Sequence, residues 1–163
     1  MAAVDFFLKI DGIEGESQDS KHKGEIEILS WSWGASQAGT ASYGGGSGAG
    51  KVKMEDFSFF KRIDKSSPKL MLACATGQHI QGKGVTLVCR KAGKEQQEYL
   101  KVTFSDVLVS SYETSGSDKE AIPLDAIKLN FSKVEFEYKE QKGDGTLGGT
   151  VKAGYDVKGN KAV

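Results

Sequence analysis

Alternation of apolar and polar side chains recurs along this chain, and this period of two constrains the fold more than any other feature. Phe6, Leu8 and Ile10 share one parity, and similar alternation returns in the segments 51–63, 85–90, 99–109, 126–138 and 151–157. Successive side chains of a strand point to opposite faces, so the pattern predicts strands with one buried face. Gly-rich or charged stretches between the segments predict turns.

A further strand begins at Glu25 and changes phase near Ile28, after which Leu29, Trp31 and Trp33 share one face. A change of phase of this kind indicates a bulge or a strong twist. We therefore expect one long, bent strand, preceded by a polar loop over residues 11–24.

One segment predicts a short helix of about three turns. Ser67 can cap it, Pro68 suits its first position and Gly77 ends it, while the apolar stripe consists of Leu70, Met71 and Cys74. The resulting order is β-β-β-α-β-β-β-β. Such a set predicts a mainly β fold, either a two-sheet β-sandwich or a partly closed β-barrel, with the one helix against one side.

The 163 residues fit a single domain, 1–163, because no repeat or second regime of composition interrupts them. Open sheets leave unpaired backbone groups at their edges, which favours self-association. The 22 basic and 22 acidic residues balance, so net charge favours neither nucleic acid nor membrane binding. The sequence has no apolar run of membrane-spanning length, and Cys74 and Cys89 are expected to be free thiols of a reducing cytoplasm.

Residues 39–50 are nearly all Gly, Ser, Thr or Ala, and we expect them to form a flexible loop. Gly45 to Lys51 has the spacing of a phosphate-binding loop. However, Val52 replaces the magnesium-binding Ser or Thr, and an alternating segment follows instead of a helix. We therefore expect no bound nucleotide and no other cofactor.

The sequence gives little support for a catalytic site or a metal-binding site. His22 and His79 lie beside turns and are expected to be solvated, and a nucleophile pair of Cys74 with His79 conflicts with the place of Cys74 on an apolar stripe. Two cysteines and two histidines that are scattered along the chain do not supply a zinc site. We expect no metal and no catalytic residue.

Carboxylates are plentiful, but the sequence does not place two of them across a cleft, as a glycosidase requires. Glu135 and Glu137 share a strand face with Lys133 and are expected to be solvated, while Asp144 is expected in a turn.

The bent strand has two unlike faces. Opposite its tryptophans lie four small residues: Ser30, Ser32, Gly34 and Ser36. Solvated strand faces usually carry longer polar side chains. A surface of short, uncharged side chains suits a molecule that slides past it or packs closely against it.

Several motifs, in order, resemble the Hcp family, the haemolysin-coregulated proteins. They are Gly15-Glu16-Ser17, the Trp-Ser-Trp strand 25–34 before a Gly-rich loop, the helix entry 65–70, Ala92-Gly93, Glu98-Tyr99-Leu100 and the strand 107–111. The resemblance spans nearly the whole chain.

The resemblance implies a non-catalytic subunit of the type VI secretion system inner tube. Members assemble into hexameric rings, which stack into a tube that is capped by a spike, driven by a contracting sheath and able to hold small effectors in its lumen. It further implies synthesis in the bacterial cytoplasm and secretion without a cleaved signal peptide. We expect Ser30, Ser32, Gly34 and Ser36 to line the lumen, with Ser32 in contact with effectors. We expect a stacking role for the loop that contains Thr40, Tyr43, Gly46 and Lys51.

Two alternatives remain. One is a carbohydrate-binding β-sandwich module with Trp31 and Trp33 as stacking platforms, which sugar binding by the isolated chain would reveal. The other is a cell-wall hydrolase, which would show turnover.

Overall fold

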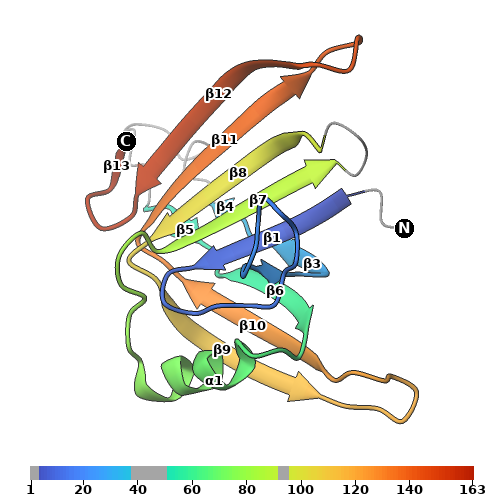
Figure 1. The fold of residues 1–163 in the computed structure, drawn as a ribbon. Helices are drawn as coiled ribbons and strands as arrows, with labels where there is room; N and C mark the ends of the chain where they lie inside the picture. Colours follow the sequence, from blue (N-terminus) through green and yellow to red (C-terminus); the bar gives the residue numbers. More distant parts are fainter. Residues whose placement is uncertain (1–3, 38–50, 92–95) are drawn as a thin grey trace.

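The computed structural model describes residues 4–37, 51–91 and 96–163, which form a mainly antiparallel β structure with one helix (Figure 1). The largest sheet has seven strands in the order β13-β12-β11-β8-β7-β1-β2. Their bounds are β1 Val4–Ile10, β2 Ile26–Glu27, β7 Val85–Lys91, β8 Glu98–Ser105, β11 Lys133–Gln141, β12 Leu147–Asp156 and β13 Lys161–Ala162.

A second sheet has four strands in the order β3-β6-β10-β9. They are β3 Ser30–Ser32, β6 Phe57–Arg62, β9 Leu108–Ser115 and β10 Leu124–Asn130. A small third sheet pairs β4 (Ala35–Ser36) with β5 (Lys53–Met54). The prediction of a mainly β, partly closed fold with one helix is thus confirmed.

The core lies between the two larger sheets and is rich in phenylalanine. Phe57 and Phe104 have ring centroids 4.9 Å apart, and Phe104 and Phe131 have centroids 4.6 Å apart. Each of these rings is at most 5% exposed. Full burial of one such side chain stabilises a fold by roughly 1.5–3 kcal/mol, so this cluster is a main source of stability.

The strand that was expected to be long and bent is three short strands, β2, β3 and β4. The amide of Ile28 donates to the carbonyl of Phe6 in the seven-stranded sheet, whereas the next amide, from Leu29, donates to the carbonyl of Phe60 in the four-stranded sheet. The chain therefore passes from one sheet to the other between these two residues. This crossing is the physical reason for the change of phase near Ile28.

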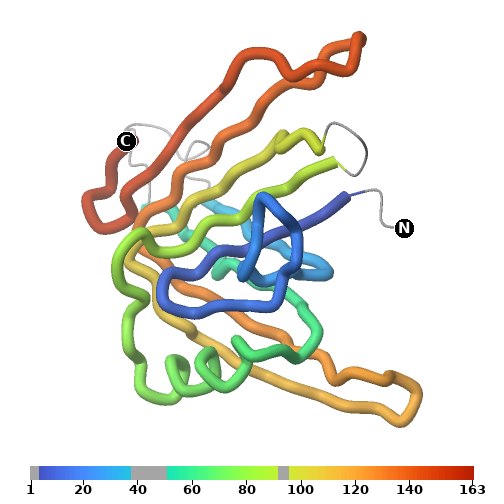
Figure 2. The backbone as a smooth tube through the Cα atoms, in the orientation of Figure 1, coloured from blue at the N-terminus to red at the C-terminus, as the bar shows by residue number. Residues whose placement is uncertain are grey.

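Three other segments that were expected to be single strands are each divided in two. Residues 51–63 form β5 in the small sheet and β6 in the four-stranded sheet. The other two segments break at turns. Residues 99–109 break between β8 and β9 at Asp106, whose φ is +54°. Residues 126–138 break between β10 and β11, where the amide of Ser132 donates to the carbonyl of Ser105. Figure 2 shows that both breaks turn the chain at one end of the molecule, while the β9–β10 and β11–β12 hairpins diverge at the other end. Alternation continues through both turns, which hides them in the sequence.

The helix, α1, spans Ser67–Thr76 and ends, as expected, at Gly77 in the left-handed conformation with φ +68°. The expected cap and stripe are partly wrong. Ser66 is the N-cap residue, Ser67 lies inside the helix and is buried, and Met71 is exposed. The buried face consists of Ser67, Leu70 and Ala73. In the described part of the chain, no helix has both the length and the apolar composition that crossing a membrane requires.

Candidate functional site: the outer face of the four-stranded sheet

The four-stranded sheet carries a row of polar side chains, three serines and one lysine, on the face that points away from the core. Ser32 on β3 pairs with Ser58 on β6, Ser58 pairs with Lys128 on β10, and Lys128 pairs with Ser111 on β9. On the opposite face of β6, Phe57 and Phe59 are buried in the core. Side-chain alternation therefore turns one register of the sheet into a continuous polar row across four strands.

Two depressions lie along this face. The larger, of about 530 Å³, is lined by Ser32, Trp33, Gly34, Lys53, Met54, Glu55, Asp56, Ser58 and Lys128. A smaller one of about 210 Å³ lies over β6, β9 and β10 and includes Ser58, Ser111 and Lys128. Ser58 and Lys128 line both, so the two depressions form one polar surface.

Hydrogen bonds hold the rim of the larger depression. The Asp56 carboxylate accepts a hydrogen bond of 2.6 Å from the Ser110 hydroxyl and one of 3.0 Å from the Asn130 amide. These contacts fix the segment before β6 to both strands of the β9–β10 hairpin. The lining includes two lysines and two acidic residues, so the surface can hydrogen-bond polar ligands of either charge.

The tryptophans next to this row point into the protein. The Trp31 ring stacks on Phe57 with centroids 6.2 Å apart, and the Trp33 ring meets Phe104 edge-on at 5.9 Å. Both are partly buried against the core. This packing disfavours the carbohydrate-platform alternative, because a sugar platform needs an exposed ring face.

Leu29, which was expected to share the apolar face of the tryptophans, is 42% exposed. That expectation was wrong because the chain changes sheets at this residue.

The structure brings some of the predicted lumen residues together. Ser30 and Ser32 lie exposed on β3, and Gly34 lines the larger depression beside Ser32. Ser36 is also exposed but belongs to the separate two-stranded sheet, where it pairs with Lys53. Sequence reasoning missed Ser58, Ser111 and Lys128, although alternation within β6 and β10 could have assigned Ser58 and Lys128 to an outer face.

Of the residues predicted for stacking, Thr40, Tyr43 and Gly46 lie outside the described residues. Lys51 is described, and it is exposed two residues before β5.

A buried ionic network anchors the helix to the four-stranded sheet. The Lys61 ammonium donates to the carboxylates of Asp125 and Asp64, each at 2.9 Å, and to the Ser67 hydroxyl at 2.8 Å. Tyr112 donates to the other Asp125 oxygen at 3.1 Å. Burial opposes ionisation of Asp125, but hydrogen bonds from Ser67 and Lys61 outweigh it and lower the pKa of this carboxyl.

The expectation that His22 is solvated was wrong. Its ring is 6% exposed and stacks on Phe7 at 4.3 Å. Its two nitrogens lie 3.0 Å from Glu25 and 2.7 Å from Glu98. The histidine therefore ties the loop over residues 11–24 to Glu98, the first residue of β8. His79, in contrast, has a half-exposed side chain and bonds to Asp106 at 2.8 Å.

Both cysteines are free thiols, as expected. Cys89 is fully buried, and this burial raises its pKa to about 12. Cys74 is partly buried and packs against the core. The described residues contain no group of three or more His, Cys, Asp or Glu side chains that could hold a metal ion.

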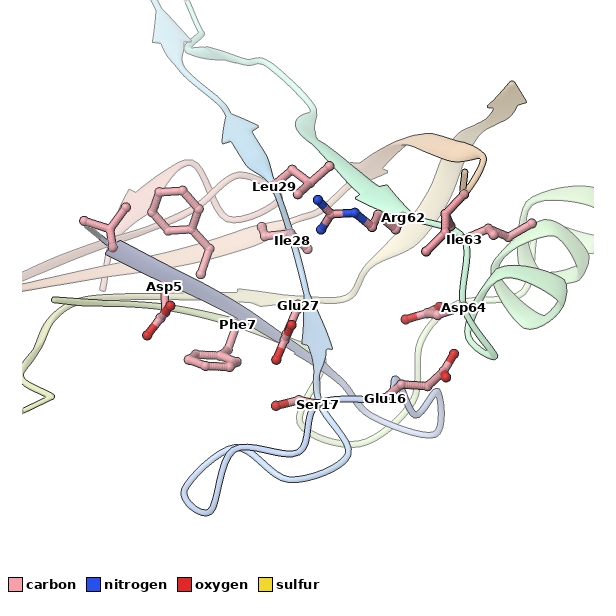
Figure 3. A pocket seen from close by; sticks show the side chains of 13 residues that line it. Asp5, Phe7, Glu16, Ser17, Glu27, Ile28, Leu29, Arg62, Ile63 and Asp64 are labelled. Atoms are coloured by element: carbon pink, nitrogen blue, oxygen red, sulfur yellow. The ribbon is translucent and has the colours of Figure 1, made fainter. Parts of the chain in front are cut away.

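A groove of about 370 Å³ lies between β1, the β2–β3 crossing and the end of β6 (Figure 3). Its lining mixes apolar side chains such as Leu29 and Ile63 with the carboxylates of Asp5, Glu16 and Glu27. Asp5 contacts the Arg90 guanidinium, and Glu16 accepts a hydrogen bond from the backbone of residue 65. These two contacts brace the Asp5 and Glu16 carboxylates against neighbouring groups of the protein.

Taken together, a mainly β fold of two larger antiparallel sheets with one helix and an open polar face is an architecture common among structural and binding proteins. The family described as "Type VI secretion system effector, Hcp" matches residues 7–138. The chain belongs to the Hcp family of type VI secretion tube proteins.

Individual relatives agree over nearly the full length. The protein hcp1 of Pseudomonas aeruginosa is 49% identical over 160 residues, which covers 97% of this chain and 98% of that protein. The crystal structure of Hcp1 from Salmonella typhimurium is 43% identical with a TM-score of 0.82, over 99% of this chain and all of that one. A type VI secretion effector from Yersinia pestis is 36% identical with a TM-score of 0.72, over 94% of this chain and all of that one.

Proposed function

We propose that six copies of this chain form a ring, that rings stack into the inner tube of a type VI secretion system, and that the outer face of the four-stranded sheet lines the lumen. The observation that carries the proposal is the polar row from Ser32 through Ser58 and Lys128 to Ser111. Short side chains leave the channel wide, while their hydroxyls and the lysine offer hydrogen bonds to a passing polypeptide.

The proposed role of this face is to hold small effectors without reacting with them. The carboxyl groups of Asp19, Asp106, Asp125 and Asp144 have pKa values below the ordinary range. A general acid needs a raised pKa instead, so these four groups are suited to ion pairing and turn formation. The thiol of Cys89, with its raised pKa, is a poor nucleophile. These features support a structural subunit and not an enzyme.

The test of the lumen assignment is Ser32→Gln, which places a longer side chain in the larger depression. We expect annular particles of normal size by negative-stain microscopy and at least about a tenfold loss of effector retention, as expected when one central contact is blocked. Thr150→Gln is the matched control, because Thr150 is an exposed hydroxyl residue on β12 in the other sheet. Normal effector retention by Ser32→Gln rings would refute the assignment.

The tube proposal extends to the segment from Thr40 to Lys51, which we assign to ring stacking, and to the spike and sheath proteins as partners. Deletion of residues 41–50 should leave single rings intact and shorten the tubes. Tubes of normal length from the deleted chain would contradict this role. We further propose export without a cleaved signal peptide, which mass spectrometry of the secreted amino terminus would check.

A further inference from the structure

The hairpin of β11 and β12 exposes an apolar face that continues the core. Along β11 the side chains of one parity run from buried Val134 to Phe136 and Tyr138, which are 38% and 41% exposed. Their partners across the hairpin are Ala153 and Val151, and Val151 is 71% exposed. We name the patch formed by Phe136, Tyr138, Val151 and Ala153 the hairpin face. The other face of β11 is charged, with Glu135 between Lys133 and Lys152.

The helix exposes a second apolar surface. Four of its exposed residues, Pro68, Met71, Leu72 and Ala75, follow the i, i+3, i+4, i+7 spacing of one helical stripe. Met71 is 48% exposed and Leu72 is 57% exposed. An isolated surface helix normally turns such a stripe toward the core, yet Leu70 and Ala73 already occupy the core side. This outward stripe, which we name the helix face, therefore lacks a covering layer in the described part of the chain.

The two apolar surfaces lie too far apart to cover each other within one copy. The helix packs beside β9, which is an edge strand of the four-stranded sheet. The hairpin strand β12 lies in the other sheet, next to its edge strand β13, and on the far side of the molecule from the helix (Figure 1). A helix laid on an apolar sheet face is a standard layer of protein architecture. A second copy can supply the layer that each surface lacks.

We infer that, within the proposed ring, the hairpin face of each copy packs on the helix face of the next copy. The contact is heterologous, since it joins two different surfaces of the same chain, and repetition of one rotation closes such contacts into a ring. The inference rests on the proposed function and adds the surfaces that meet.

Charge and area both fit this pairing. Residues 65–76 contain Lys65 and Lys69 and no acidic residue, whereas the one charged residue of β11 with the parity of Phe136 and Tyr138 is Glu140. The eight side chains of the two faces expose on the order of 600 Å², which is about half of the ~1,200 Å² that the smaller specific interfaces bury. Neighbouring backbone and polar rim can supply the remainder.

The test uses two single variants of the full chain, Val151→Asp and Leu72→Asp. Each places a charge in one apolar surface, so each should raise the concentration needed for ring formation by about 100-fold while the circular dichroism spectrum stays native. Thr150→Asp is the matched control, because it adds the same charge to the neighbouring residue of β12 on the opposite strand face, and its rings should persist.

Mixing the two variants separates this pairing from any other arrangement. The intact helix face of Val151→Asp can meet the intact hairpin face of Leu72→Asp, but the two remaining surfaces are both blocked. Sedimentation velocity should therefore show 1:1 dimers that grow no further. Monomers in the mixture, or normal rings from either single variant, would overturn the inference. A wild-type chain that stays monomeric at high concentration would instead overturn the proposed function.

Discussion

Lys61 and Asp125 form an ion pair of 2.9 Å in which neither side chain reaches solvent. Loss of one partner leaves an uncompensated buried charge, so Lys61→Met should destabilise the fold by about 3–5 kcal/mol. Urea unfolding at fixed protein concentration, followed by tryptophan fluorescence, measures this effect. The double variant Lys61→Met, Asp125→Leu should regain much of the loss. Lys9→Met, at an exposed position, is the control, and an equal loss there would contradict the assignment.

The contact between Arg90 and Asp19 should make stability depend on pH in the acid range. The Arg90 guanidinium donates to both Asp19 oxygens and lowers the pKa of this carboxyl from 3.8 to about 2. A carboxyl with a lowered folded-state pKa binds fewer protons when folded, so its stabilisation is complete above about pH 4 and is lost as the pH falls toward 2. Asp19→Asn should flatten the unfolding free energy over that window, and an unchanged pH profile would rule out the pair.

Gly15 marks a place where the polar loop touches β2 without room for a side chain. An added Cβ would lie 2.6 Å from the carbonyl oxygen of Glu25 and 2.7 Å from the Cα of Ile26. Both are backbone atoms, so Gly15→Ala must displace the loop, at a cost of about 1–3 kcal/mol. Thermal unfolding measures this cost. Gly143→Ala meets nothing within 4 Å and should leave the midpoint unchanged, whereas equal midpoints for both variants would exclude the close approach.

The two thiols should react at very different rates. At pH 8 burial keeps Cys89 inaccessible and its pKa near 12 keeps it protonated, whereas Cys74 is partly accessible. A chromogenic disulfide reagent should therefore titrate one thiol per native chain and two in denaturant. Cys74→Ser should abolish the fast native reaction. Rapid labelling of Cys89 in that variant would show that the sheet around it opens readily.

The sequence predicts local structure well where one face of a segment is buried and the other face is exposed to solvent. Alternation located β1 and β7, and the Pro and Gly signals located the helix, because each signal is contained within a few residues. Alternation alone could not reveal the turn at Asp106. Its carboxylate is fixed by His79 and Ser132, which are distant in the chain.

Features that depend on distant residues escaped prediction for the same reason. The burial of His22 depends on Glu98, 76 residues away. The polar row depends on the pairing of Ser32 with Ser58 and of Ser58 with Lys128, a register that no single segment encodes. The small residues of β3 were nevertheless identified correctly, since alternation with two tryptophans assigns their face.

The passage of the chain between sheets at Ile28 and Leu29 has a mechanical consequence. Within a few residues, one stretch of backbone is bonded to Phe6 of the first sheet and to Phe60 of the second. Backbone hydrogen bonds thus tie the segment before Ser32 to both sheets, and the neighbouring Trp31 ring stacks on Phe57 in the core. Because its first strand is anchored in this way, we expect the polar row to keep its shape when another molecule moves along it.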